Sequence, residues 1–262
     1  MGRLKRVGIF ADLHCGHFAG LTHPNWFVSA GTERGKGIRV MQQDAWRSFR
    51  RLLKKTGPFD IAIWNGDLID GRGERSGGTE LVTTDRVEQC DMASRVVQIT
   101  GAKTNIFTRG TPYHTGHLED WENMIANECN GVIGDHKFVD VNGLILDVKH
   151  KVAGSSIPHG RFTSAAKDRF WNLVWADRED GQPRADVIIR SHVHYHIFCG
   201  DFDWLALTTP ALQLAATKFG ARQCSGTVDW GFTTFDVKNK ENWTWLAHRV
   251  RQAAVKVKLE VV

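Results

Sequence analysis

The first half of the chain alternates short apolar runs with longer segments that are apolar on one side. The apolar runs predict strands at Val7–Phe10, Phe59–Trp64 and Thr104–Thr108. The longer segments predict helices over Met41–Lys55, Thr84–Thr100 and Leu118–Glu128. The stretch Cys15–Lys36 has no such periodicity and predicts a long loop. Strand, crossover helix and parallel strand recur, so the carboxyl ends of these strands should meet at one edge of a sheet.

The second half changes to a strand-rich pattern. Two apolar stretches around Asn142-Gly143 predict a hairpin made of Lys137–Val141 and Leu144–Lys149. An amphipathic helix is predicted over Ala165–Ala176. Further strands are predicted at Val187–Arg190, Trp204–Thr208, Thr227–Asp236 and in the alternating segment from Trp243. No repeat or low-complexity linker interrupts the pattern, so we expect one α/β domain over residues 1–262.

Composition limits the cellular location and the binding partners expected for this domain. The 262 residues contain no apolar run of about eighteen, which argues against a membrane span. The five cysteines show no C-x-x-C spacing, which favours reduced thiols and a cytoplasmic location. The net charge of +5 favours an anionic partner such as a nucleotide or a nucleic acid.

One predicted helix also carries a basic face, formed by Arg47, Arg50, Arg51 and Lys54. A solvated helix surface is the commoner meaning of such a face, and a nucleic-acid footprint is the alternative.

Candidate chemistry is concentrated where the predicted strands end. The first strand runs into Asp12-Leu13-His14, and the second runs into Asn65-Gly66-Asp67. His150 follows the hairpin, and Ser191-His192-Val193-His194 follows the next buried strand. Carboxylates and imidazoles at strand ends on one edge of a sheet can point at the same cation. Such a mixed nitrogen and oxygen donor set suits transition metals better than Mg²⁺ or Ca²⁺.

These blocks, in this order, resemble the signature of the calcineurin-like metallophosphoesterases. The resemblance implies a two-sheet β-sandwich flanked by helices, with two divalent metal ions at the strand ends. It assigns Asp12, His14 and His194 to the first metal, and His150 and His192 to the second. A carboxylate can span two metals and an imidazole cannot, so Asp67 is the expected bridge. Manganese is the favoured metal, with Fe, Zn, Ni and Co as alternatives.

The third block departs from the family pattern, which has Gly-Asn-His. Here Gly110 is followed by Thr111-Pro112-Tyr113-His114. We expect His114 to take the place of the catalytic histidine, with Glu119 or Asp120 as an orienting acid. Thr111, His17 or water could replace the missing Asn ligand. Cys15, within the first block, is interpreted as a small filler residue, with a soft metal ligand as the alternative.

The function implied is hydrolysis of a phosphate ester through a dinuclear metal centre and a bridging hydroxide. The net positive charge favours a phosphodiesterase acting on a nucleotide or nucleic acid, with Arg72 and Arg75 as phosphate contacts. A phosphomonoesterase (a protein or nucleotide phosphatase) would use the same chemistry. A non-catalytic binding module on this scaffold is the third possibility, although such modules lose metal ligands and this chain retains them. The remaining histidines are expected to be surface or hydrogen-bonding residues: His23, His117, His136, His159, His196 and His248.

Overall fold

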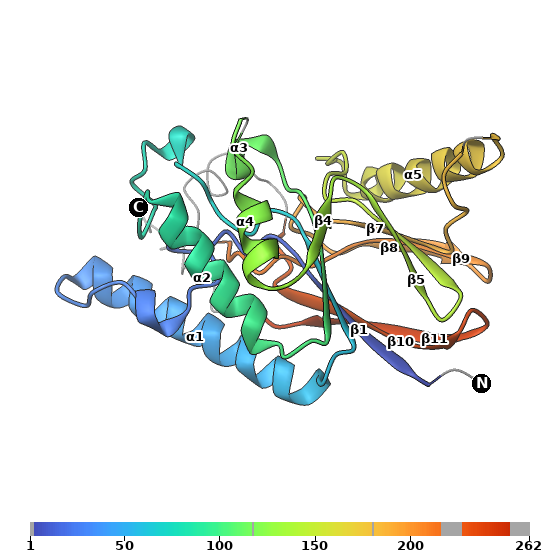
Figure 1. Cartoon of the computed structure of the whole chain (residues 1–262). Helices are drawn as coiled ribbons and strands as arrows, with labels where there is room; N and C mark the ends of the chain where they lie inside the picture. The colour runs from blue at the N-terminus through green and yellow to red at the C-terminus, as the bar shows by residue number, and fades with distance from the viewer. Residues whose placement is uncertain (1–2, 117, 180, 216–226, 252–262) are drawn as a thin grey trace, which may run out of the picture.

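A computed structural model describes residues 3–116, 118–179, 181–215 and 227–251. In this part of the chain, two β-sheets are stacked face to face and helices cover both outer sides (Figure 1). Helices α1 and α2 lie outside one sheet, and α5 lies outside the other. The predicted two-sheet α/β sandwich is therefore confirmed.

The first sheet has six strands and a parallel centre. Its order is β11 (Asn242–Arg249), β10 (Gly231–Asn239), β1 (Lys5–Phe10), β2 (Ile61–Asn65), β3 (Thr104–Thr108), β4 (Val132–Gly134). Strands β1 to β4 run parallel to one another, and β10 and β11 are antiparallel additions. The ends of β1, β2 and β3 consequently lie along one edge.

The second sheet has five strands and again a parallel centre. Its order is β5 (Lys137–Val141), β6 (Leu144–Val148), β7 (Val187–Arg190), β9 (Trp204–Thr208), β8 (Phe198–Asp201). Strands β6, β7 and β9 are parallel, whereas β5 pairs with β6 as the predicted hairpin. Asn142 and Gly143 both have positive φ at the turn, which is what a two-residue hairpin of this kind requires.

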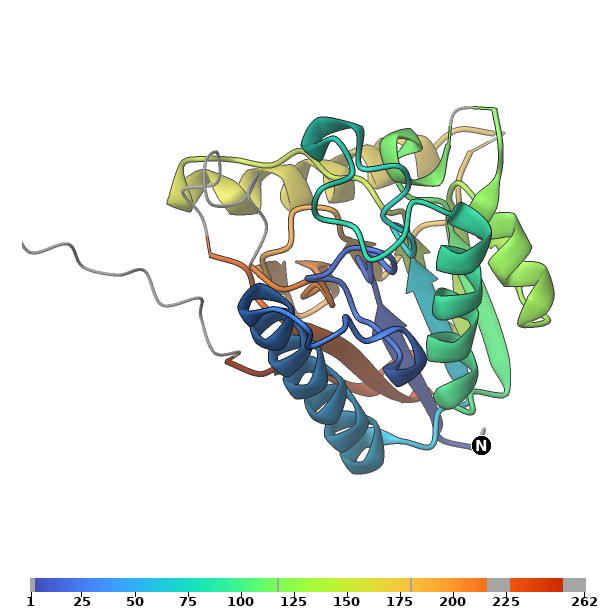
Figure 2. The same ribbon diagram turned by 90° about the vertical axis from the view of Figure 1, so that its left-hand side faces the viewer.

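Five α-helices are described: α1 (Glu33–Thr56), α2 (Arg86–Ile99), α3 (Pro112–Thr115), α4 (Trp121–Glu128) and α5 (Arg161–Ala176). Figure 2 looks onto the side covered by α1 and α2, with β1 and β2 rising behind them. None of these helices is both long enough and apolar enough to cross a membrane.

Alternation along the strands divides the apolar residues between two cores. Val7 and Ile9 of β1 face the second sheet and pack with a cluster that includes Leu146 and Ile189. Phe10 faces the helices and joins an aromatic cluster, stacking on Trp64 with ring centroids 4.7 Å apart. Strand β2 and the end of β1 are therefore buried on both faces, which explains their nearly continuous apolar sequence.

The structure corrects the start of α1 and adds three short elements. Helix α1 begins at Glu33, eight residues before the predicted start, because Thr32 caps it by accepting a hydrogen bond from Gly35 N. Gly35 and Gly37 conceal this first turn in the sequence, and the predicted loop is correspondingly shorter. The short strands β4 and β8 and the four-residue helix α3 were not predicted.

Candidate metal centre

The predicted ligands stand at matching positions beyond their strands. Asp12, Asp67, His150 and His192 each lie two residues after the last residue of β1, β2, β6 and β7 respectively. Asp12, Asp67 and His192 have φ of 52°, 52° and 74°, and His14 and His194 also have positive φ. Few residues other than glycine adopt a positive φ, and this backbone conformation costs roughly 1–3 kcal/mol per residue. Such costs concentrated on one set of polar residues mark a functional site.

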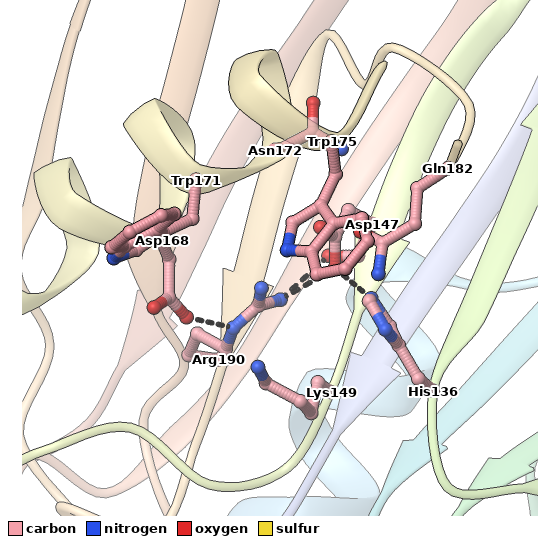
Figure 3. A pocket seen from close by; sticks show the side chains of 9 residues that line it. All are labelled: His136, Asp147, Lys149, Asp168, Trp171, Asn172, Trp175, Gln182 and Arg190. Carbon is pink, nitrogen blue, oxygen red and sulfur yellow. Dashed lines mark hydrogen bonds and ion pairs between the residues drawn. The ribbon is translucent and has the colours of Figure 1, made fainter. Parts of the chain in front are cut away.

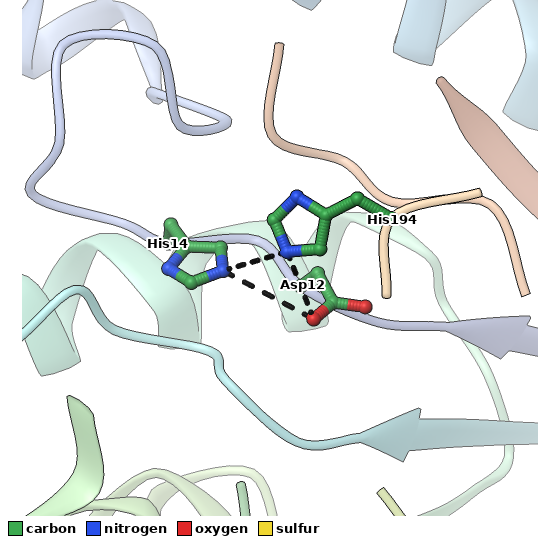
Figure 4. A group of neighbouring side chains, drawn as sticks. All are labelled: Asp12, His14 and His194. Atoms are coloured by element: carbon green, nitrogen blue, oxygen red, sulfur yellow. Dashed lines mark hydrogen bonds and ion pairs between the residues drawn. The ribbon is translucent and has the colours of Figure 1, made fainter. Parts of the chain in front are cut away.

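The first donor group consists of Asp12, His14 and His194 (Figure 4). The Nε2 atoms of the two histidines are 3.3 Å apart. They lie 4.0 Å and 3.2 Å from Asp12 Oδ1, in the order His14 and His194. That oxygen is buried and accepts no hydrogen bond from any described residue. A buried carboxylate oxygen without a donor is costly, and a cation between these three atoms would compensate it.

The second donor group consists of Asp67, His150 and His192. Asp67 Oδ2 lies 3.0 Å from His150 Nε2 and 3.8 Å from His192 Nδ1. Asp67 also belongs to a third group with His14 and His114, in which all ligand atoms lie within 4.8 Å of one another. The structure thus brings all six predicted ligands together and places Asp67 between two sets of imidazoles.

Hydrogen bonds fix which imidazole nitrogen faces the centre. His14 Nδ1 donates to Asp70 Oδ1 at 3.0 Å, and His150 Nδ1 donates to the carbonyl of Asn65 at 2.6 Å. Their Nε2 atoms are therefore free to act as metal ligands. Burial, together with His114 and His194, holds the pKa of His14 well below its ordinary value, so this ring is neutral.

The charges of the site also favour a cation. Burial alone would raise the pKa of Asp67, but His150 and His114 outweigh burial and hold it well below its ordinary value. Burial alone would lower the pKa of His150, but Asp67 and Asp12 raise it to about 10. An extra proton is therefore favoured on His150 in the metal-free protein, at the place where a metal ion would supply the positive charge. The donor set fits a nitrogen- and oxygen-ligated divalent ion.

Two glycines allow Asp67 to enter this cluster. A Cβ on Gly66 would lie 2.6 Å from the His150 ring, and Gly66 has φ of 77°. A Cβ on Gly110 would lie 2.2 Å from both Asp67 N and Oδ1. Thr111 then donates its N–H to Asp67 Oδ1 at 2.6 Å and lies with its hydroxyl 3.1 Å from the same oxygen. Of the residues considered as replacements for the missing Asn, Thr111 is the one in contact with Asp67.

His114 is oriented mainly by the backbone of Asp70, not by either of the predicted acids. Its Nδ1 donates to the backbone carbonyl of Asp70 at 2.8 Å and lies 3.7 Å from the Asp70 carboxylate. The expectation that Glu119 or Asp120 orients His114 is wrong. Glu119 pairs with Arg86, and Asp120 pairs with Arg109 and caps α4. Asp70, three residues after Asp67, contacts both His14 and His114 and was not recognised as a site residue in the sequence.

A second residue that was not recognised in the sequence, Glu122, connects the loop after β2 to the loop after β3. Its carboxylate accepts hydrogen bonds from Leu68 N at 2.9 Å and Gly110 N at 2.7 Å. The residue is fully buried, and burial raises its pKa to about 7. Glu122 therefore holds the β2 and β3 loops in register around the central carboxylate.

Asn65 connects the two sheets at the same edge. Its side-chain amide donates to Ser191 Oγ at 2.6 Å and to the carbonyl of Lys149 at 3.3 Å. The side-chain oxygen Oδ1 of Asn65 accepts a hydrogen bond from Thr108 Oγ1 at 2.5 Å. The Ser191 hydroxyl in turn contacts the Thr209 hydroxyl at 2.7 Å. Ser191 thus supplies a hydrogen bond between the sheets that carry the two halves of the donor set.

The other candidates lie apart from the donor groups. His17 Nδ1 accepts a hydrogen bond from Ala19 N, and the Cys15 thiol is buried and donates to the carbonyl of Leu21. Burial raises the pKa of Cys15, which supports the filler interpretation. Arg72 is exposed beside Gly71, which packs against the backbone of His114. The Arg75 side chain and the whole of His117 and Cys224 lie outside the described residues.

The basic face of α1 is exposed, and two of the remaining histidines, His136 and His248, make side-chain hydrogen bonds. Arg50, Arg51 and Lys54 are exposed, and Arg47 pairs with Asp44 on the same helix. His136 contacts Asp147 at 2.7 Å, and His248 contacts Thr234 at 2.8 Å.

No protein-family profile matches the chain, and no curated protein matches it in sequence. Solved structures do match it. An archaeal phosphodiesterase is 12% identical over 92% of this chain and 98% of its own, with a TM-score of 0.44. Vacuolar Protein Sorting 29 from Cryptosporidium parvum is 13% identical over 95% and 99%, with a TM-score of 0.46. Purple acid phosphatase PPD1 from yellow lupin is 11% identical over 93% and 51%, with a TM-score of 0.46. These likenesses concern backbone arrangement, and the chemistry of this chain rests on its own residues.

Replacing Asp67 with asparagine should reduce the metal content by at least one ion per chain, because the substitution removes the charge shared by two donor groups. Metal bound per chain after exhaustive buffer exchange checks this. The exposed carboxylate Asp177, replaced in the same way, should leave the metal content unchanged. Equal metal content in Asp67→Asn and the unaltered protein would contradict a central role for Asp67.

Glu122 should make the stability of the metal-free protein pH-dependent. Its pKa is raised from 4.5 to about 7 in the folded state, so the folded protein holds this proton more tightly. The stabilisation is complete below about pH 4.5 and is lost as the pH rises through 7. The unfolding free energy of the unaltered protein relative to Glu122→Gln should therefore fall between pH 4.5 and 7.5, as urea titrations can show. The exposed Glu241→Gln should give no such slope.

Proposed function

We propose that this chain hydrolyses phosphate esters with two divalent cations held by Asp12, His14 and His194 on one side and by His150 and His192 on the other. The observation that carries the proposal is the position of Asp67, shared between two sets of imidazoles next to a buried carboxylate oxygen of Asp12 that lacks a donor. When bound, the cations would neutralise charge on the phosphoryl oxygens and acidify a water molecule. Manganese is our first choice of metal, in a cytoplasmic enzyme.

His114 is the proposed proton donor to the leaving oxygen. Its Nδ1 hydrogen is engaged by the carbonyl of Asp70, so the proton available for transfer is the one on Nε2. The His14 and His114 rings meet edge to face with centroids 4.5 Å apart, which places His114 beside the donor groups. The side chain of His114 is 17% exposed and that of His192 is 35% exposed, so substrate can approach from this side.

The preferred substrate is a phosphodiester of nucleotide or nucleic-acid type. Arg72 is exposed one residue beyond Gly71, whose backbone touches α3, the helix that carries His114. An arginine here can contact a phosphate flanking the reacting one. The net charge of +5 also favours binding of an anionic substrate.

Metal-stripped protein should hydrolyse a model diester such as bis(p-nitrophenyl) phosphate only after Mn²⁺, Fe²⁺, Zn²⁺, Ni²⁺ or Co²⁺ is added. The rate should exceed that for the monoester p-nitrophenyl phosphate, because the proposed substrate is a phosphodiester, which carries one negative charge where a monoester carries two. Asp67→Asn provides the inactive control. Metal binding without hydrolysis of either ester would instead support the non-catalytic binding module.

Replacing His114 with alanine should slow hydrolysis of an alkyl ester by roughly 10²–10⁴-fold, because an alkoxide leaves poorly without a proton. The loss should be much smaller for a p-nitrophenyl ester, whose leaving group needs little protonation. Comparison of kcat for the two esters measures the difference. Equal losses would contradict a proton-donor role, and a fall in metal content would assign His114 as a ligand through the group it forms with His14 and Asp67.

A further inference from the structure

A pocket of about 270 Å³ lies between helix α5 and the outer face of the second sheet (Figure 3). Strand alternation separates it from the metal centre. Val148 points into the core between the sheets, whereas Asp147 and Lys149 line the pocket on the other face. This pocket has no role in the chemistry proposed above, although Lys149 directly precedes the ligand His150.

Arg190 forms the floor of the pocket with its guanidinium only partly engaged. The residue is 2% exposed. Its Nε donates to Asp168 at 2.5 Å, and its Nη1 donates to Asp147 Oδ1 at 2.7 Å. Its Nη2 makes no hydrogen bond to any described residue, and Figure 3 shows this nitrogen directed into the pocket. The guanidinium is held by Asp168, Asp147 and the carbonyls of Asp147 and Ile189, so Nη2 is fixed in place as a charged donor that an anion in the pocket can reach.

Lys149 adds a second donor of the same kind. Its side chain is half-buried and reaches toward Arg190 in Figure 3. Among the described residues, no carboxylate pairs with its ammonium group. The two carboxylates of the pocket are already engaged, since Asp147 accepts from both Arg190 and His136 and Asp168 accepts from Arg190. The groups that lack partners are therefore positively charged donors.

The mouth of the pocket is aromatic. Trp171 and Trp175 lie one turn apart on α5 and are 53% and 42% exposed. The guanidinium of Arg178 lies 4.7 Å from the Trp175 ring centroid and brings another positive charge to the rim. The residues that α5 buries, Ala165, Arg169 and Asn172, are all small or polar. The helix thus exposes the flat rings that would ordinarily be expected in its buried face.

We infer that this pocket is a second ligand site, which binds a phosphate carried on a planar ring, as in a nucleoside monophosphate. Lys149 and Arg190 Nη2 hold the anionic group, and the indoles of Trp171 and Trp175 stack against the ring. The pocket volume of about 270 Å³ is slightly below the usual range for small-molecule sites, so a mononucleotide with its phosphate at the floor would place its ring at the aromatic rim.

Calorimetric titration of the metal-stripped full chain, with chelator present, tests the inference. The probes are adenosine monophosphate, adenosine and inorganic phosphate. The monophosphate should bind roughly tenfold or more tightly than either of the others, because only it uses both the cationic floor and the aromatic rim. Adenosine or inorganic phosphate binding as tightly as the monophosphate would overturn the inference.

Two variants separate this pocket from the metal centre. Lys149→Met and Trp175→Leu should each weaken binding of the monophosphate by roughly tenfold. Lys151→Met, an exposed lysine two residues further on, is the matched control and should leave binding unchanged. Monophosphate binding that is the same in Lys149→Met, Trp175→Leu and the unaltered protein would place the ligand elsewhere and overturn the inference.

Discussion

The burial of two carboxylates around one imidazole is the constraint on which this structure depends. His150 Nε2 lies 3.0 Å from Asp67 Oδ2 and 4.0 Å from Asp12 Oδ1, and neither carboxylate is exposed to solvent by more than 1%. Two negative charges in a weakly polar interior repel each other and lose their hydration. They persist only where positive charge can be brought to them, and imidazoles from both sheets surround them here. A divalent cation would complete the compensation.

The backbone around the site is arranged to meet this constraint. Left-handed turns at Asp12, Asp67 and His192 redirect each chain immediately after its strand, so that side chains from separate strands converge. Beyond the strands, the loops remain paired: Asp12 N donates to Gly66 O at 3.0 Å, and His14 N donates to Asp67 O at 3.0 Å. These backbone hydrogen bonds offset part of the conformational strain. The backbone of the loops that carry the donor residues is thus held in place by hydrogen bonds.

The strands and the polar residues that follow them could be predicted from local patterns, whereas the two-sheet sandwich and the ligand assignments followed from the resemblance of these motifs to the metallophosphoesterase signature. Apolar runs mark the strands, and polar residues directly after them mark the edge where Asp12, Asp67, His150 and His192 meet. What could not be predicted depends on contacts between distant segments. Asp70 acts on His14 and His114 only because its loop pairs with that of Cys15, and Glu122 reaches Leu68 and Gly110 from a helix far along the chain. Glycines at 35 and 37 similarly concealed the start of α1.

The polar bridge from Asn65 to Ser191 has a consequence for how the protein assembles. The first sheet and its loops supply Asp12, His14 and Asp67, while the second sheet supplies His150, His192 and His194. The two donor groups that contain His194 or His192 each combine residues from both sheets, so a metal ion bound there would require the sheets to be docked in the register that Asn65 and Ser191 fix. An ion bound by such a group would link the two halves of the chain, and its binding free energy would add to that of folding. The metal ions would act as the last cross-link of the sandwich, one that chelators can reversibly remove.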